Sequence, residues 1–129
     1  MEATETVYEI HIRGAGSPQV NGVYYPCYRV LKDGGIIVFE NAVWRIMYYA
    51  TKTSFGPAWY LQRGADALAA YWNKLDADMS PMPGADFHNV PTSGWAAYTG
   101  AWSLPGKDPA PTVKVKAKSI LTEAARVGI

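Results

Sequence analysis

Apolar and polar residues alternate along several short segments of this chain, most clearly over residues 7–13. There, Tyr8, Ile10 and Ile12 fall on one side of an extended chain, and the polar residues between them fall on the other. This period of two is typical of a strand that buries one face. The segment 7–13 is therefore predicted to be a half-buried β-strand, and the glycines that follow it end the strand.

Turn residues divide the next part of the chain into further strands. Asn21-Gly22 is a tight-turn dipeptide, because asparagine tolerates and glycine favours positive φ, and it leads into a β-favouring segment at 23–25. A second glycine turn, at 33–35, separates residues 29–32 from the apolar run 36–39. This arrangement predicts a hairpin.

Three later segments are also predicted to be strands. Residues 43–50 are apolar on both faces, which is typical of a strand in the centre of a packed sheet. Residues 58–63 and 95–98 form shorter β-favouring runs.

Near the C-terminus, two valines alternate with two lysines, at Val113, Lys114, Val115 and Lys116. Lysines on a strand at the edge of a sheet discourage unwanted pairing with other chains. This segment is therefore predicted to be an exposed edge strand.

Two segments carry helical patterns. In 66–75 the apolar residues fall at helical spacing, which favours a short amphipathic helix, but the aromatic pair Tyr71-Trp72 leaves a strand open. In 119–127, Ser119 is a candidate N-cap and a glycine follows as a stop, so a short helix is predicted there.

Together these patterns predict an all-β fold, mainly antiparallel, with roughly six to eight short strands in a small sandwich or barrel and a short C-terminal helix. The prolines and glycines of 80–94 predict a long connecting loop. A chain of 129 residues has the size of one domain. We expect an N-terminal leader at 1–6, a β-rich domain at 7–116 and a helical tail at 117–129.

Several short motifs follow one another in order along residues 8–116. They are a first strand that ends at Gly14, Asn21-Gly22-Val23-Tyr24, Tyr48-Tyr49, Trp59-Tyr60-Leu61, Tyr71-Trp72, Ser80-Pro81, Gly94-Trp95 and a closing strand after Pro111. In this order they resemble a small β-rich, repeat-type domain found in kinetoplastid, euglenid and algal proteins. The segment 26–30 departs from the Gly-x-Pro-x-Tyr pattern of such domains, and the loop 80–94 is longer than theirs. The resemblance implies an all-β unit used for protein contacts, without known catalytic residues, in which 66–75 is more strand-like than its spacing indicates.

The net charge argues against bulk affinity for nucleic acid. Lys+Arg number 12 and Asp+Glu 11, which leaves a formal charge of +1, whereas such binding requires many neutralised phosphates. The charge is uneven, because residues 107–129 carry a local +3 and residues 66–86 a local −3. Either these regions meet different partners or they are ordinary solvated surface.

Side chains suited to catalysis or metal binding are sparse. The chain holds Cys27, His11 and His88 as its cysteine and histidines, and they match no zinc motif, so no metal or other cofactor is predicted. Asp86 and His88 could form part of a catalytic set, but no motif positions a nucleophile beside them. We therefore expect that the chain is not an enzyme.

Cysteine use and the N-terminal residues bear on location. One cysteine cannot form an internal disulfide, and the acidic N-terminus has neither an apolar signal core nor an Arg-rich transit pattern. A helix needs about 20 apolar residues to span a bilayer, and no apolar run in the sequence approaches that length. We expect an intracellular protein, cytoplasmic or cytoskeletal, with a mitochondrial complex as the alternative.

Aromatic residues supply the candidate binding surface. Five Trp, nine Tyr and three Phe make up 13% of the chain, so some rings are expected at the surface, where they anchor partners well. The alternative is that the tryptophans simply form the core. The candidate binding residues are Trp59, Tyr60, Trp95, Tyr98 and Trp102, together with the basic Lys114 and Lys116.

Two functional hypotheses follow. The first is a non-catalytic protein-interaction module, an accessory or scaffold subunit of a cytoskeletal, axonemal or organellar assembly, whose C-terminal tail docks on a neighbouring subunit. The second is a carbohydrate- or peptide-binding module, which requires a row of exposed rings on one face. An enzyme would instead require titratable groups that converge in a pocket.

Overall fold

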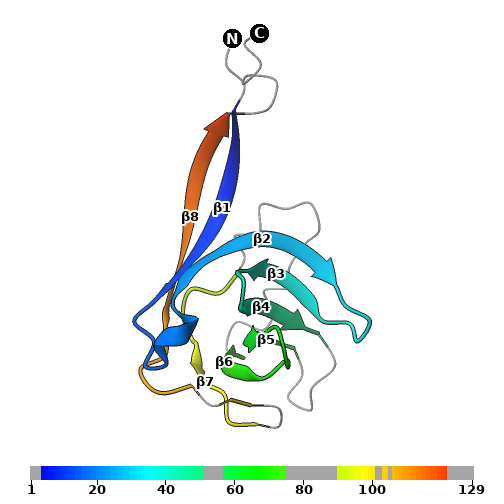
Figure 1. Ribbon diagram of the computed structural model, residues 1–129, viewed down its shortest axis with the longest axis vertical. Coiled ribbons are helices and arrows are strands. Elements are labelled where there is room, and N and C mark those ends of the chain that lie inside the picture. The colour runs from blue at the N-terminus through cyan, green and yellow to red at the C-terminus, as the bar shows by residue number, and fades with distance from the viewer. Residues whose placement is uncertain (1–3, 51–56, 75–89, 101–102, 105, 122–129) are drawn as a thin grey trace.

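The computed structural model describes residues 4–50, 57–74, 90–100, 103–104 and 106–121. These residues confirm the all-β prediction, since they form one curled antiparallel sheet with the shape of a half-barrel and a single turn of 3-10 helix, η1, Pro18–Val20 (Figure 1). The strands are β1 Thr4–Arg13, β2 Gly22–Val30, β3 Ile36–Glu40, β4 Trp44–Tyr49, β5 Ala58–Arg63, β6 Ala69–Asn73, β7 Ala96–Ala97 and β8 Thr112–Leu121.

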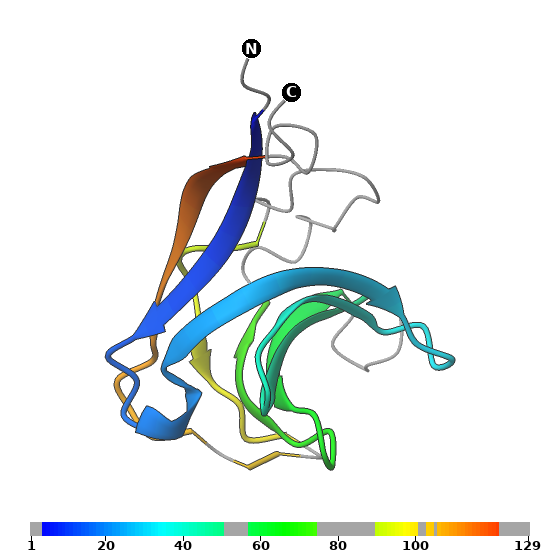
Figure 2. The same cartoon turned by 45° about the horizontal axis from the view of Figure 1, so that its top comes forward.

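The first seven strands form a meander, and the last strand lies beside the first. The strand order of the sheet is β7-β6-β5-β4-β3-β2-β1-β8, so each strand from β1 to β6 pairs with the next one, and β8 returns to pair with β1. Figure 2 shows β2 to β6 curling around a common interior, while the β1–β8 pair stands away from them. As a result, β8 lies at one edge of the sheet.

Irregular pairing between strands explains the curl of the sheet. The register shifts between Pro26 and Arg29 on β2, between Ile37 and Phe39 on β3, and between Leu61 and Gln62 on β5. Such bulges bend a strand and increase its twist. Three of them, in the β2–β3, β3–β4 and β5–β6 pairs, help to bend the meander into a half-barrel.

Both faces of the central strands are buried, as the apolar pattern of 43–50 predicted. On β4, Ile46 and Tyr48 pack into one hydrophobic cluster, whereas Met47 and Tyr49 pack into a second cluster on the other face of the sheet. Side chains alternate between the faces of a strand. The first cluster joins β1, β2 and β8 to the sheet, and the second spans β3 to β6.

The predicted hairpin at 29–39 is confirmed. Val30 pairs with Ile36 across the β2–β3 turn, and the backbone N–H of Leu31 donates to the oxygen of Gly35 at 2.8 Å. Gly34 has φ +90°, a conformation that glycine adopts without steric cost. Asp33 also stabilises the turn, because its Oδ1 accepts a hydrogen bond from the N–H of Gly35 at 2.9 Å.

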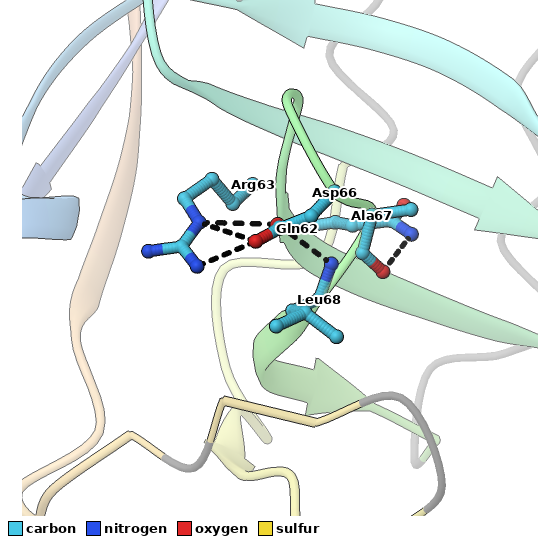
Figure 3. A network of polar contacts seen from close by, with 5 residues as sticks. All are labelled: Gln62, Arg63, Asp66, Ala67 and Leu68. Carbon is cyan, nitrogen blue, oxygen red and sulfur yellow. Dashed lines mark hydrogen bonds and ion pairs between the residues drawn. The ribbon is translucent and has the colours of Figure 1, made fainter.

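The helix predicted from the spacing in 66–75 is wrong for the described residues, and the strand alternative is correct for Ala69–Asn73. Figure 3 shows the β5–β6 turn, in which the guanidinium of Arg63 contacts the carboxylate of Asp66 at 2.6 Å. Ala67 follows with φ +61°, which stops a right-handed helix. Pairing with β5 then makes Ala69–Asn73 a strand.

The predicted helix at 119–127 is wrong for residues 119–121. These residues complete β8, with Ser119 opposite Thr6 and Leu121 opposite Thr4. The pairing offered by β1 outweighs a helical preference that is marginal for a single short helix. Residues 122–127 lie outside the described residues, as do 80–89 of the predicted loop 80–94.

The chain between β7 and β8 is fastened to the start of the molecule through Tyr71. The Tyr71 hydroxyl accepts a hydrogen bond from the N–H of Ser17 at 3.1 Å and donates one to the oxygen of Lys107 at 2.6 Å. The N–H of Lys107 donates to Ser17 Oγ at 2.8 Å. One phenol of β6 therefore holds the β1–β2 connection and the segment before β8 together.

Candidate interaction surface

The four described aromatic candidates lie in the core, so the expectation that they occupy the surface is wrong. Trp59 is 0% exposed, Tyr60 4%, Trp95 8% and Tyr98 7%. Trp59 and Tyr60 are adjacent on β5, which is buried on both faces, and so one ring enters each hydrophobic cluster. Trp102 lies outside the described residues.

Packing among the rings fixes the second cluster. The ring of Tyr60 lies edge-on to those of Tyr49 and Tyr98, with centroids 5.8 and 5.4 Å away, and Trp72 lies edge-on to Tyr98 at 5.4 Å. Edge-to-face contacts at this spacing stabilise aromatic pairs by roughly 0.5–1.5 kcal/mol each. These rings therefore hold the sheet together, and partners do not reach the buried ones.

Trp95 has a structural role of the same kind in the first cluster. Its indole Nε1–H donates a hydrogen bond of 2.8 Å to the backbone oxygen of Pro91. Nearby, the buried amide of Asn73 donates to the oxygen of Ser93. The Asn73 bond attaches the described segment before β7 to β6, and the Trp95 bond holds that segment in a turn.

Unlike the aromatic candidates, the two lysine candidates lie at the surface. Lys114 and Lys116 are exposed on β8, as predicted, and Lys118 continues the same alternation. Alternate residues of a strand share a face, so the three ammonium groups line one face of β8. We call this set, Lys114, Lys116 and Lys118, the lysine row.

β1 supplies the rest of the face that carries the lysine row. In the strand register, Lys114 lies opposite His11, Lys116 opposite Glu9 and Lys118 opposite Val7. Glu9 Oε1 contacts His11 Nε2 at 3.1 Å, and in the described part of the chain none of the three lysines has an ion pair. The lysine row is therefore a stretch of positive charge, with Glu9 opposite its middle lysine.

The opposite face of β8 is apolar and continues the core. Val113 is 2% exposed and packs into the first cluster, Val115 is half-buried against it, and Ala117 is exposed. Burial thus decreases along β8 toward its C-terminal end. On β1, Tyr8 lies opposite Ala117 and still packs against the first cluster. The rest of the β1–β8 ribbon projects from the half-barrel (Figure 1).

β8 is an edge strand, as the alternation of valine and lysine predicted. It pairs with β1 along its whole length, with Thr112 opposite Arg13 at one end and Leu121 opposite Thr4 at the other. No described strand pairs with its outer side. An edge strand presents unpaired backbone N–H and C=O groups. Sequence reasoning missed Lys118 as a site residue because it assigned 117–129 to a helical tail, although the alternation itself runs on to Lys118.

Arg29 and Glu40 hold two strands together beside Cys27, and the thiol is kept protonated chiefly by its burial. Arg29 forms a two-pronged ion pair with Glu40, at 2.6 and 2.9 Å, across the β2–β3 pairing. Burial, and next the negative charge of Glu40, raise the pKa of Cys27 to about 11. A neutral thiol is a poor nucleophile.

Among the described residues, no three His, Cys, Asp or Glu side chains come close enough to hold a metal ion. Asp86 and His88, the pair with catalytic potential in the sequence, lie outside this part of the chain. No helix in the described ranges has the length and hydropathy needed to cross a membrane.

Comparisons of the chain with protein-family models, curated proteins and solved structures find no match. The described residues define the class of fold, which is an eight-stranded antiparallel half-barrel with a projecting two-stranded ribbon.

Proposed function

We propose that this chain is a non-catalytic protein-interaction module that contacts other protein subunits through its β1–β8 ribbon. The observation that carries the proposal is the ribbon itself, because a 10-residue edge strand extends beyond the core with three exposed lysines and a side on which no described strand pairs. Isolated two-stranded ribbons are marginally stable in water. A ribbon that projects is better stabilised when a partner covers it.

The distribution of aromatic residues also favours the ribbon over a ring-lined site. Carbohydrate binding would require exposed rings on one face, but Trp59, Tyr60, Trp95 and Tyr98 are buried. The role of accessory or scaffold subunit, in a cytoskeletal, axonemal or organellar assembly, belongs to the same proposal. It draws on the sequence resemblance to protist domains.

Site-specific photo-cross-linking in lysate of the source cells tests the proposal. A photoreactive residue in place of Ala117, which is exposed on the ribbon, is expected to give cross-linked products with another polypeptide. The matched control places the same residue at Val43, which is 52% exposed in the β3–β4 turn, and is expected to give none of these products. If Ala117 gives no product, or gives only cross-links between copies of this chain, the proposal is wrong.

A further inference from the structure

The open side of β8 and the lysine row lie on the same strand, and together they define a kind of partner. We infer that β8 accepts an extended acidic segment of another protein as an additional strand of the sheet. The inference rests on the proposed function, since it names what the ribbon binds. It also specifies the pattern of the ligand, in which acidic and apolar residues alternate.

Pairing with β1 prepares the backbone of β8 for an added strand. β8 is 10 residues long and pairs with β1 along its whole length, so its backbone is held extended before any partner arrives. An extended peptide added to such an edge gains main-chain hydrogen bonds at alternate residues. Because β1 orders β8 in advance, less conformational entropy is lost on binding.

The spacing of the lysine row matches the residue spacing of an added strand. Consecutive lysines of the row are two residues apart, which places them about 6.6–6.8 Å from each other along the strand. A partner strand has the same repeat, so carboxylates at alternate positions would each lie beside one ammonium group. Directly opposed residues in a sheet have Cβ atoms about 4.5–5.5 Å apart, a distance at which opposite charges attract.

The other face selects the residues between the carboxylates. Val113, Val115 and Ala117 point to the face that continues the core, and burial there falls from Val113 toward Ala117. Apolar side chains on an added strand would extend this face over Val115 and Ala117. The preferred ligand therefore alternates Glu or Asp with β-branched apolar residues.

A second copy of β8 fits this edge poorly. If two β8 strands met at their outer sides with their faces aligned, Lys114, Lys116 and Lys118 of one copy would face the lysine row of the other. Like charges directly opposite one another destabilise a strand pair. The lysines that protect the edge from self-association therefore leave an acidic strand as the compatible partner.

Nucleic acid is also a poorer fit than an acidic strand. The whole chain has a formal charge of +1, and affinity for nucleic acid grows with the number of phosphates neutralised. Glu9 lies opposite Lys116 in the middle of the charged face and would repel a phosphate there. Phosphates would also make no use of the backbone groups on the open edge.

Fluorescence anisotropy with short synthetic peptides and the full chain tests the inference. The probe is a labelled peptide of about eight residues, close to the usual length of a strand, in which glutamate and valine alternate. Two controls keep its length: one replaces glutamate by lysine, and the other carries N-methyl groups that block backbone pairing. The alternating acidic peptide is expected to bind at least about tenfold more tightly than either control, and more weakly as salt rises from roughly 0.1 M to 1 M.

A matched pair of protein variants locates the site. The triple variant Lys114→Gln, Lys116→Gln, Lys118→Gln is expected to bind the acidic peptide roughly tenfold more weakly, because three surface ion pairs are removed. The control variant Lys32→Gln, Lys74→Gln, Lys107→Gln removes the same charge from exposed lysines elsewhere and is expected to bind as the unmodified chain does. Amide chemical shifts in the unmodified chain should change first on β8 when the peptide is added, which tests the site without any substitution.

The outcomes separate this inference from the proposed function. Equal binding of the acidic and N-methylated peptides, or tighter binding of a single-stranded oligonucleotide of matched charge, would overturn the acidic-strand inference. If Ala117 still cross-links to another polypeptide in that case, the interaction function stands and only the nature of the partner is wrong. If Ala117 gives no product, the proposed function fails whatever the peptides do.

Discussion

The hydroxyl of Tyr71 on β6 donates a hydrogen bond of 2.6 Å to the backbone oxygen of Lys107, 36 positions further along the chain. The same oxygen atom of Tyr71 accepts a hydrogen bond from the N–H of Ser17, 54 positions earlier. The phenol therefore connects the beginning, the middle and the end of the sheet. Since β8 follows Lys107 closely, this contact also fixes where the ribbon begins.

Removing that hydroxyl is expected to loosen the base of the half-barrel. The substitution Tyr71→Phe keeps the buried ring but leaves the Ser17 N–H and the Lys107 oxygen without this partner, and a buried group that loses its hydrogen bond costs about 1–3 kcal/mol. Urea unfolding should show the free energy of unfolding lowered by this amount. Tyr25→Phe, at an exposed tyrosine, is the control, and equal midpoints for both variants would contradict the role given to Tyr71.

Two glycines allow the segments around Tyr71 to approach one another. A Cβ at Gly106 would overlap the Tyr71 ring, and a Cβ at Gly16 would overlap the backbone of Lys107 and Asp108. Gly106→Ala and Gly16→Ala are therefore each expected to lower the free energy of unfolding by about 1–3 kcal/mol, the usual cost of overpacking. Thermal unfolding measures this. Ala42→Val adds bulk at an exposed position, and a loss of stability as large as that of the glycine variants would argue against a steric cause.

The strands could largely be predicted from the sequence, because a period of two is a local signal. Tyr8, Ile10 and Ile12 share a face in the structure as the alternation required, and 43–50 is central because it is apolar on both faces. The helices predicted in 66–75 and 119–127 were wrong where the structure describes them. Helical spacing is a local pattern, whereas strand pairing depends on a partner that is distant in the sequence. Ala69–Asn73 has β5 beside it and Ser119 has Thr6, contacts that no local pattern contains.

The candidate surface could be predicted only in part, for a related reason. Lysines that alternate with valines report an edge strand locally, so Lys114 and Lys116 were found. Aromatic residues give no such signal, because a large ring packs equally well in a core or on a surface. The burial of Trp59 and Tyr60 on opposite faces follows from the curl of the sheet and from the segments that cover it, neither of which is visible in the spacing of the rings.

The thiol of Cys27 is expected to react slowly at neutral pH. Burial and the charge of Glu40 raise its pKa to about 11 from an ordinary 9.0, so the thiolate fraction at pH 8 is roughly 10- to 100-fold below that of a free cysteine. The rate of alkylation by iodoacetamide, measured against pH, checks this. Glu40→Gln should speed the reaction, because it removes a charge that raises the pKa, and Arg29→Gln should slow it, because Arg29 lowers the pKa. Equal rates in both variants would show that burial alone sets the reactivity.

Alkaline pH is expected to destabilise the fold partly through Tyr49. Burial and the negative charge of Asp33, which accepts a hydrogen bond of 3.2 Å from the phenol, raise the pKa of Tyr49 to about 12 from an ordinary 10.0. The folded state thus favours the protonated phenol. Its contribution to stability is fully present below a pH of about 10 and is lost as pH rises toward 12.

The substitution Asp33→Asn separates the effect of charge on Tyr49 from that of burial. Asparagine keeps an oxygen that accepts from the N–H of Gly35 but carries no charge, so the pKa of Tyr49 should fall toward 10 while the β2–β3 turn remains formed. Ultraviolet absorbance of the tyrosinate, taken as the difference between each protein and its Tyr49→Phe counterpart, isolates this one titration. A titration midpoint unchanged by Asp33→Asn would mean that burial in the second cluster, where the ring contacts Tyr60, accounts for the shift without help from the turn.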